Sequence, residues 1–248
     1  MVSKLKSVFP TQFKNKLKRV LGHDIPKGYT TINGRNIVFI RIPKSASTSI
    51  AHVLGYTDIK HLKDAHKFDK NGREISTRER RVKFIPHSDL REYSDLMGES
   101  VLKDAFIFTF IRNPWDKALS HFRYYERINQ HRLGELPIDF NQWVDWVYGD
   151  IKHPYYCHSL KLFQDFHDWV YHPNPAIKPD FIGKVENIEE DWQKVSEMIG
   201  LDERLEMTNK SKRQTSELRK QLYNDHSAEL IYQHHKRDIE RWNYSFDD

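Results

Sequence analysis

The stretch that decides the fold is IVFIRIPKSASTS, from Ile37 to Ser49. Its first four residues are an apolar run typical of a buried strand, and its Ser- and Thr-rich end is typical of the start of a helix. A strand that turns directly into a helix points backbone N–H groups and the positive end of the helix dipole at one place, where an anion is stabilised. Lys44 adds a positive charge, and hydroxyl donors come from Ser45, Ser47, Thr48 and Ser49. The stretch therefore predicts an anion-binding loop.

This loop lacks the glycines of the loop that binds nucleoside triphosphates. That loop reads Gly-x-x-x-x-Gly-Lys-[Ser/Thr], and neither glycine is present in Arg41-Ile-Pro-Lys-Ser-Ala-Ser-Thr-Ser. The anion is therefore expected to be something other than ATP. Ser and Thr also occur at such junctions simply because they cap helices, so the loop alone leaves both interpretations open.

A second segment of the same kind is FIFTFIRNPWDKALS, from Phe106 to Ser120. Its apolar start is typical of a buried strand and runs into Arg112. Pro114 follows at a position where a helix tolerates the missing N–H, and Ser120 lies about two turns into that helix. A lone arginine is most often at the surface or ion-paired, but Arg112 and Ser120 are placed to close on one phosphate. Two anion-binding segments, each at the end of an apolar strand, indicate a nucleotide-type ligand.

Together, the two segments resemble the sulfotransferases that use 3′-phosphoadenosine 5′-phosphosulfate (PAPS). The first is most similar to the carbohydrate branch (sulfotransferase family 2), notably the uronyl 2-O-sulfotransferases, and the resemblance runs from about Asn36 to the C-terminus. It implies an α/β, P-loop-like sulfotransferase fold in a single domain, with a central parallel sheet flanked by helices. It also implies that the 3′-phosphate is held by Arg112 and Ser120, and the 5′-phosphosulfate by Arg41, Lys44, Ser45, Ala46, Ser47, Thr48 and Ser49.

Three later stretches agree with this resemblance. FIGKVENIEEDW, residues 181–192, is similar to the family's third strand and the helix after it, and Asn187 with Glu190 also reads as a capping box. MTNKSKR, residues 207–213, resembles the basic loop over the 3′-phosphate and adenosine, which implies cofactor contacts from Lys210, Ser211 and Arg213. DIERWNYSF, residues 238–246, resembles the family's closing helix and tail. Lys117 departs from the pattern, because relatives often carry Arg there and its bidentate contact would be lost.

Length and composition indicate one globular domain. The chain has 248 residues, 38% of them hydrophobic and 30% charged, and no linker, repeat or low-complexity tract divides it. We expect a sulfotransferase domain over residues 31–248 and a basic helical extension over residues 1–30. No apolar run approaches the ~20 residues that cross a bilayer, and the start shows no secretory signal, so we expect a cytoplasmic protein. The single cysteine, Cys157, cannot form an internal disulfide.

The positive charge is uneven along the chain. The net charge is +5, and residues 1–21 hold six Lys or Arg and no acid. Such patches attract anions generally, including a polyanionic cofactor, an acidic glycan, nucleic acid or an anionic membrane surface. One helical face carries Phe13, Leu17, Val20 and Leu21, which favours a helix packed on the domain and leaves a membrane-surface helix as the alternative. We expect no nucleic-acid partner, and the sequence does not indicate an oligomeric state.

The hydrophobic periodicities predict strands that alternate with helices. The expected strands are 36–42, 105–111 and 180–185, and the expected helices are 47–54, 89–97, 114–132, 140–148, 156–166, 187–199, 216–223 and 227–241. This alternation indicates a parallel sheet with helices on both faces. Ligands of such sheets sit at the carboxyl ends of the strands, where Lys44 and Arg112 fall.

The implied reaction moves a sulfuryl group from a phosphate leaving group to an acceptor oxygen. The enzyme must align the two partners and stabilise charge on the leaving oxygen, and Lys44 suits the second task. Fixed cations can neutralise the cofactor, so the scheme needs no metal. The acceptor is expected to be a carbohydrate or another hydroxyl compound, and nothing identifies the sugar.

The acceptor hydroxyl must lose a proton, and histidine is the natural base near neutral pH. Among the 14 histidines, His87 is preferred because it precedes the helix that leads into the second strand, and the corresponding segment of the uronyl 2-O-sulfotransferases holds a base histidine. His61, His66 and a carboxylate remain alternatives.

Two other clusters have plain structural interpretations. His226, His234 and His235 look like a metal cluster, but no Cys or carboxylate lies at ligand spacing, which favours a solvated helix face. Helical spacing of Phe140, Trp143, Val144, Trp146 and Val147 favours a buried face over a sugar-stacking platform.

Two rival functions explain less of the sequence. A nucleotide kinase would need a Gly-rich loop and Mg²⁺ ligands, and neither is recognisable. A non-catalytic binder of nucleic acid or acidic glycan explains the basic patches but leaves Lys44, Arg112 and Ser120 unexplained.

Overall fold

The computed structural model describes residues 30–54, 87–129, 139–150, 160–201, 203, 205 and 216–248. Several sequence predictions therefore lie outside the described residues. They are the N-terminal helical extension, the alternative bases His61 and His66, Cys157, and the predicted cofactor contacts Lys210, Ser211 and Arg213.

A four-stranded sheet with the order β1-β2-β3-β4 forms the centre of the fold. The strands are β1 (Thr30–Ile32), β2 (Arg35–Ile40), β3 (Phe106–Ile111) and β4 (Phe181–Lys184). The last three are parallel, as the alternation of strands and helices predicts. β1 is antiparallel to β2 and was not predicted, although the Asn33-Gly34 turn with positive φ at both residues is a strong hairpin signal.

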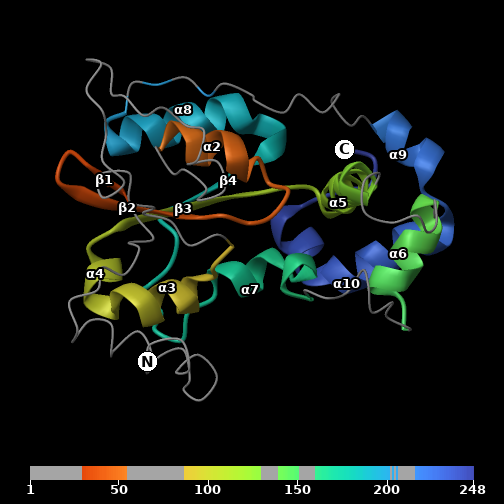
Figure 1. The fold of residues 1–248 in the computed structure, drawn as a ribbon, viewed down its shortest axis with the longest axis horizontal. Helices are drawn as coiled ribbons and strands as arrows, with labels where there is room; N and C mark the ends of the chain where they lie inside the picture. Colours follow the sequence, from red (N-terminus) through yellow and green to blue (C-terminus); the bar gives the residue numbers. More distant parts are fainter. Residues whose placement is uncertain are drawn as a thin grey trace, which may run out of the picture.

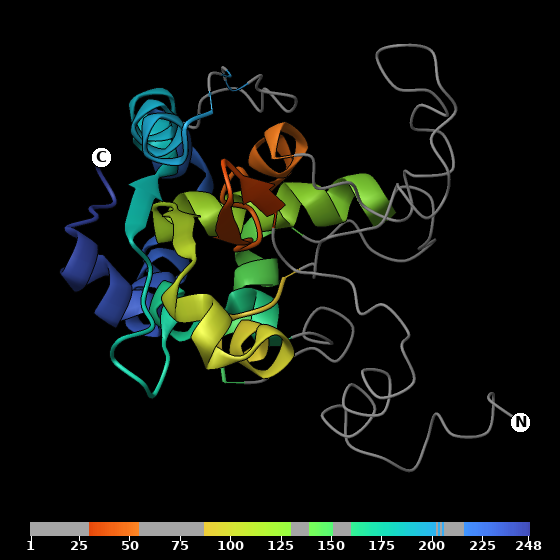
Figure 2. The ribbon, with the colours of Figure 1, turned by 90° about the vertical axis from the view of Figure 1, so that its left-hand side faces the viewer.

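Helices cover both faces of this sheet (Figures 1 and 2). One face carries α2 (Ser47–Val53) and α8 (Ile188–Ile199), and the opposite face carries α3 (Leu90–Met97), α4 (Glu99–Lys103) and α7 (Phe166–Val170). Alternate residues of each strand enter different hydrophobic clusters. Phe39 and Phe108 pack with the α2 and α8 side, whereas Val38 and Ile107 pack with the other side. Residues 37–40 of β2 and all of β3 are therefore buried on both faces, which explains their unbroken apolar sequences.

A second group of helices packs beyond the end of the sheet (Figure 1). It comprises α5 (Pro114–Asn129), α6 (Phe140–Tyr148), α9 (Ser216–Leu222) and α10 (Asp225–Trp242). α10 contacts both α5 and α6. Phe140, Trp143, Val144 and Val147 are buried in this group, so the buried-face interpretation of the aromatic helix is confirmed.

Two local predictions need correction. The predicted helix 156–166 is replaced, in its described part, by the short 3-10 helix η2 (Leu160–Phe163), with α7 after it. Asn187 occupies the N-cap of α8, after the 3-10 helix η3 (Val185–Asn187), but its side chain makes no capping hydrogen bond. Instead, the carboxylate of Asp191 accepts a hydrogen bond from the Lys184 N–H and ties β4 to the first turn of α8.

One glycine is required where β4 packs against β3. A Cβ atom placed on Gly183 would lie 2.5 Å from the ring of Phe110, which is fully buried. The close approach of these two strands therefore depends on a residue without a side chain.

None of the described helices is both long and apolar enough to cross a membrane.

Candidate functional site

The loop between β2 and α2 has a backbone shape suited to an anion. Lys44 and Ala46 both adopt left-handed conformations, with φ of 66° and 54°, which non-glycine residues rarely do. Such residues next to right-handed ones aim successive N–H groups into a concave nest. Ser45 is buried, and among the described residues nothing hydrogen-bonds to its Oγ. A cradle with an unsatisfied donor fits an anionic ligand.

The hydroxyl groups of this loop are not equivalent. Ser45, Ser47 and Ser49 are buried, whereas Thr48 is exposed at the start of α2. The three serines therefore also contribute to packing, while the predicted cofactor contact of Thr48 is the one open to solvent.

Arg112 joins the two predicted anion-binding segments. It follows the end of β3, and its Nη1 donates a hydrogen bond to the Lys44 carbonyl oxygen at 3.3 Å. The carboxyl ends of β2 and β3 therefore bring a guanidinium and an ammonium group to one edge of the sheet, as the sequence predicts. The pKa of Lys44 is lowered to about 8, first by burial and then by the charges of Arg112 and Arg127.

The side chain of Lys44 rests on an exposed aromatic ring of α5. Its Nζ lies 4.5 Å from the centre of the Tyr124 ring, and the guanidinium of Arg127 lies 5.6 Å from the same ring. Tyr124 is 40% exposed. This cation–π contact holds the ammonium group beside the loop. The contribution of Tyr124 and Arg127 was missed by sequence reasoning, although both lie on the Ser120 side of α5 at helical spacing.

Two carboxylates, the buried Asp116 and the more exposed Glu186, act on the charge of Arg112. Burial lowers its pKa, and the negative charges of Asp116 and Glu186 oppose that shift. Glu186 accepts a hydrogen bond from the Asn113 N–H at 2.7 Å and another from the Tyr244 hydroxyl at 3.3 Å. Burial raises the pKa of Glu186. These contacts fix the backbone next to Arg112 and keep the guanidinium charged.

The C-terminal tail is fastened to the first turn of α5. The Asn113 side chain donates to the Ser245 carbonyl oxygen at 2.8 Å and accepts from the Trp115 N–H at 3.1 Å. The buried guanidinium of Arg219 pairs with Asp116 at 2.9 Å and donates to the Phe246 carbonyl oxygen at 2.8 Å. The resemblance of residues 238–246 to a closing helix and tail therefore has a physical counterpart in this packing.

His87, the preferred base, lies in space beside Arg41, the residue that follows β2. Its Nδ1 is 3.0 Å from the carbonyl oxygen of Arg41. A carbonyl oxygen only accepts, so Nδ1 carries the proton and Nε2 carries the lone pair that a base needs. His87 also has a positive φ of 55°, which turns the chain sharply there. The structure thus brings His87 next to the Arg41–Ser49 loop without testing its role.

Two residues of α5, Ser120 and Lys117, differ in their surroundings. Ser120 is half-buried, and its convergence with Arg112 on one phosphate stays a prediction. Lys117 is fully buried, donates to the Gln164 carbonyl oxygen at 3.0 Å and lies over the Phe166 ring, so it faces the interior. Its burial lowers its pKa to about 8.

His121, next to Ser120, is a buried histidine that sequence reasoning missed. Its pKa lies well below the usual range because of burial, with smaller contributions from Lys117, Lys44 and His87. It therefore stays neutral beside the site. Its only sequence signal is its position one residue after Ser120.

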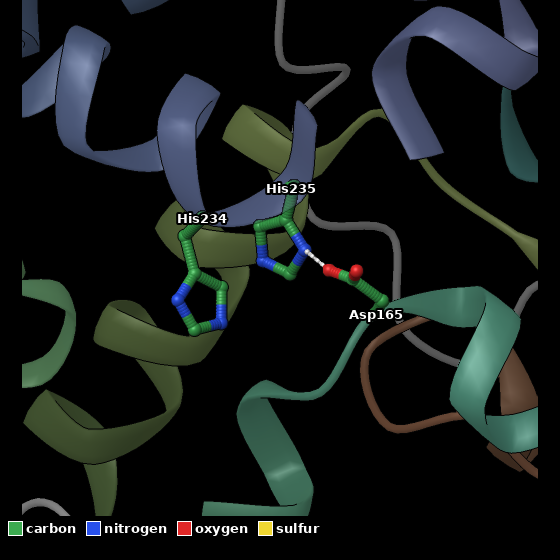
Figure 3. A group of neighbouring side chains, drawn as sticks. All are labelled: Asp165, His234 and His235. Carbon is green, nitrogen blue, oxygen red and sulfur yellow. Dashed lines mark hydrogen bonds and ion pairs between the residues drawn. The ribbon is translucent and has the colours of Figure 1, made fainter. Parts of the chain in front are cut away.

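The C-terminal histidines are not all on a solvated face, which corrects the sequence interpretation. His235 is fully buried, and its Nδ1 lies 3.0 Å from Oδ1 of Asp165 (Figure 3). His234 is exposed but lies beside it, and His226 is exposed and contacts Asp145 at 2.9 Å. Asp165 is 70 residues away in sequence, which is why spacing along the chain did not indicate a carboxylate partner.

The sequence model of the sulfotransferase family matches residues 27–245. The chain belongs to the sulfotransferase family. This confirms the resemblance inferred from the two anion-binding segments, and the α/β fold with a parallel central sheet agrees with it.

Individual relatives add little detail. An uncharacterized protein of Archaeoglobus fulgidus is 32% identical over 113 residues, which cover 45% of this chain and 81% of that protein. A sulfotransferase from Alicyclobacillus acidocaldarius is 15% identical with a TM-score of 0.33, and the match covers 83% of this chain and 97% of that one.

Proposed function

We propose that this sulfotransferase moves the sulfuryl group of PAPS to a hydroxyl group of a carbohydrate acceptor. The observation that carries the proposal is the hydrogen bond from Arg112 to the Lys44 carbonyl oxygen. This bond joins the Arg41–Ser49 loop to the Phe106–Ser120 segment. Taken separately, the loop could be explained by helix capping and Arg112 by ordinary ion pairing. Family membership supports sulfuryl transfer in general, and the left-handed loop with its unsatisfied Ser45 Oγ supports a phosphate-containing donor.

In the proposed reaction, the acceptor oxygen attacks sulfur while the bond between sulfur and the 5′-phosphate oxygen breaks. The hydroxyl proton goes to His87 Nε2, and the electron pair of the broken bond stays on the phosphate oxygen. Lys44 stabilises that charge, and the loop N–H groups hold the phosphate. Arg112, with Ser120 and the predicted contacts Lys210, Ser211 and Arg213, would hold the 3′-phosphate. Fixed cations supply the neutralisation, so we propose transfer without a metal.

A carbohydrate acceptor is favoured by two features. The Arg41–Ser49 loop resembles the carbohydrate branch in sequence. The exposed Tyr124 ring, with Lys44 and Arg127 against it, offers a flat apolar surface next to positive charge, which suits an acidic sugar. We also propose a cytoplasmic location, with residues 1–21 as a contact to an anionic membrane surface; both proposals rest on sequence alone.

The decisive experiment is transfer of ³⁵S from labelled PAPS to a panel of neutral and acidic glycans, with and without EDTA. The proposal expects a labelled glycan in the presence of EDTA, and transfer at least about 100-fold slower with Lys44→Ala. Phosphate transfer from ATP with Mg²⁺ would instead support a kinase. Tight glycan binding without transfer to any acceptor would support a non-catalytic binder.

A further inference from the structure

Two neighbouring histidines of α10 come together at an irregular point of the helix. His235 has φ −108° and ψ 18°, which is not helical, in the middle of α10. Consecutive side chains of a regular helix point about 100° apart. Here the imidazole rings of His234 and His235 lie with their centres 4.7 Å apart and nearly perpendicular. One ligand atom from each of Asp165, His234 and His235 lies within 4.8 Å of the other two.

The inner histidine has one nitrogen with a partner and one without. The ring of His235 lies between Asp165 and His234, with Nδ1 toward the carboxylate (Figure 3). An ionised carboxylate only accepts, so Nδ1 carries the proton and Nε2 carries a lone pair. The side chain is fully buried, and among the described residues nothing hydrogen-bonds to Nε2. A buried nitrogen without a partner is unfavourable unless a ligand occupies the position next to it.

A carboxylate that orients a histidine is the usual outer partner of a metal-bound imidazole. Asp165 is itself held in place, because Arg237 donates to its Oδ2 at 2.9 Å and to Asp168 at 2.8 Å. This leaves Oδ1 of Asp165 facing His235. The carboxylate of Asp165 thus orients the imidazole of His235, whose Nε2 lone pair lies on the opposite side of the ring. The two residues come from separate segments of the chain.

The outer histidine, His234, lies at an open hollow of the surface. An open hollow of about 700 Å³ is lined in part by Asp165, His234 and Glu240. The exposed ring of His234 lies at its edge, with Nε2 2.9 Å from the Phe163 carbonyl oxygen. A carbonyl oxygen only accepts, so Nε2 of His234 carries the proton in this contact. To bind an ion at Nε2, the ring would move that proton to Nδ1, and the ion would replace the hydrogen bond to Phe163.

We propose that His234 and His235 bind one transition-metal ion through their imidazole nitrogens, with Asp165 as the carboxylate that orients His235. Mg²⁺ and Ca²⁺ are bound by oxygen ligands, so a site made of two imidazole nitrogens disfavours them. Imidazole ligands select Zn²⁺, Ni²⁺ or Cu²⁺. The ion would link α10 to the segment formed by η2 and α7, and would serve stability and not sulfuryl transfer.

The test is calorimetric titration of the EDTA-treated, untagged full chain with ZnCl₂, NiCl₂ and MgCl₂. We expect one saturable equivalent of Zn²⁺ or Ni²⁺ and none of Mg²⁺. At about 100 times the dissociation constant, the bound ion should raise the melting temperature by roughly 5 to 10 °C. The chain has 14 histidines, so the variants decide where binding occurs.

His234→Ala is the main variant, because His234 is exposed and its loss should leave the fold intact. It should abolish the saturable binding and the melting shift. Asp165→Asn should weaken binding about 10- to 100-fold, the usual effect of losing an outer partner. His226→Ala, an exposed histidine of the same helix, is the matched control and should bind like the wild type. Binding that survives in His234→Ala, or that is lost in His226→Ala, would overturn the proposal, as would equal binding of Mg²⁺.

Discussion

Arg112 donates a hydrogen bond to the backbone carbonyl of Lys44, across the carboxyl ends of β2 and β3. The two residues are 68 positions apart in sequence. The contact places two positive side chains at one edge of the sheet, and the charge of Arg112 adds to the effect of burial in lowering the pKa of Lys44. Bringing two cations together is unfavourable by itself, so an anion bound between them gains from both.

Replacing Lys44 by alanine should lower the rate of sulfuryl transfer at least about 100-fold, the usual effect of removing one charge-stabilising donor from a transition state. The measurement is ³⁵S transfer under saturating PAPS. Lys103→Ala, at an exposed lysine of α4, is the matched control and should transfer normally. A folded Lys44→Ala protein with normal activity would remove Lys44 from the reaction.

The pH profile should follow the protonation of Lys44. Its pKa of about 8 means that the side chain is cationic below that pH and neutral above it. The value of kcat/KM, which reports the free enzyme, should therefore fall as the pH rises through about 8. Bound PAPS adds negative charge, so the fall in kcat should occur at higher pH.

Lys44→Arg is the control for this profile, because arginine stays charged over the whole range. Its residual activity should not fall between about pH 7 and about pH 9.5. If the wild type and this variant lose activity at the same pH, the titrating group is a different residue.

Replacing His87 by alanine should reduce the transfer rate by roughly 10² to 10⁴ and leave the affinity for the desulfated cofactor almost unchanged. The two quantities are measured separately, by ³⁵S transfer and by calorimetry. His87 also contacts the Arg41 carbonyl oxygen, so the variant could instead disturb the loop. Loss of cofactor affinity would show that structural role and leave the base unassigned. His172→Ala, at a histidine that contacts Asn174, serves as the control.

The chain should distinguish a 3′-phosphorylated nucleotide from ordinary ones. At about 100 times its dissociation constant, 3′-phosphoadenosine 5′-phosphate should stabilise the fold by about 2.7 kcal/mol and raise the melting temperature by roughly 5 to 10 °C, without Mg²⁺. ADP and AMP should do much less. Arg112→Ala should remove most of this preference, and Arg112→Lys should restore only part of it, because lysine lacks the planar fork. A preference that persists in Arg112→Ala would move the 3′-phosphate site to Lys210–Arg213.

Gly183→Ala should destabilise the fold by about 1 to 3 kcal/mol, the usual cost of an added group in a packed core. The new Cβ would lie 2.5 Å from the Phe110 ring. Chemical denaturation measures the loss. Phe110→Leu should be less harmful in the Gly183→Ala background than alone, because the smaller side chain makes room for the methyl group. Strictly additive effects would show that the two residues do not clash.

The central strands could be predicted because burial on both faces leaves an unbroken apolar signature. β2 and β3 lie within one or two residues of the predicted 36–42 and 105–111. β1 was not predicted, because a strand of three residues is too short to show a hydrophobic periodicity. The Asn33-Gly34 turn after it is nevertheless a hairpin signal that the sequence contains. Lys44 and Arg112 were predictable as a pair because parallel strands end at one edge of a sheet.

The remaining contacts of the site join distant segments, and sequence spacing carries no information about them. The contact of His87 with Arg41 spans 46 residues, and that of His235 with Asp165 spans 70. The second explains why the histidines of α10 were wrongly predicted to be solvated as a group. Tyr124 and His121 gave no motif, because a tyrosine or histidine within an amphipathic helix is ordinary.

The left-handed conformations of Lys44 and Ala46 have a consequence for how the loop meets its ligand. A glycine at these positions could adopt many backbone conformations, whereas a residue with a side chain has fewer backbone conformations available to it. The loop therefore loses little conformational entropy when an anion arrives, since most of that loss has already occurred during folding. The loop should consequently have the same conformation with and without its anion, because the surrounding fold maintains the strained φ angles of these two residues in both states.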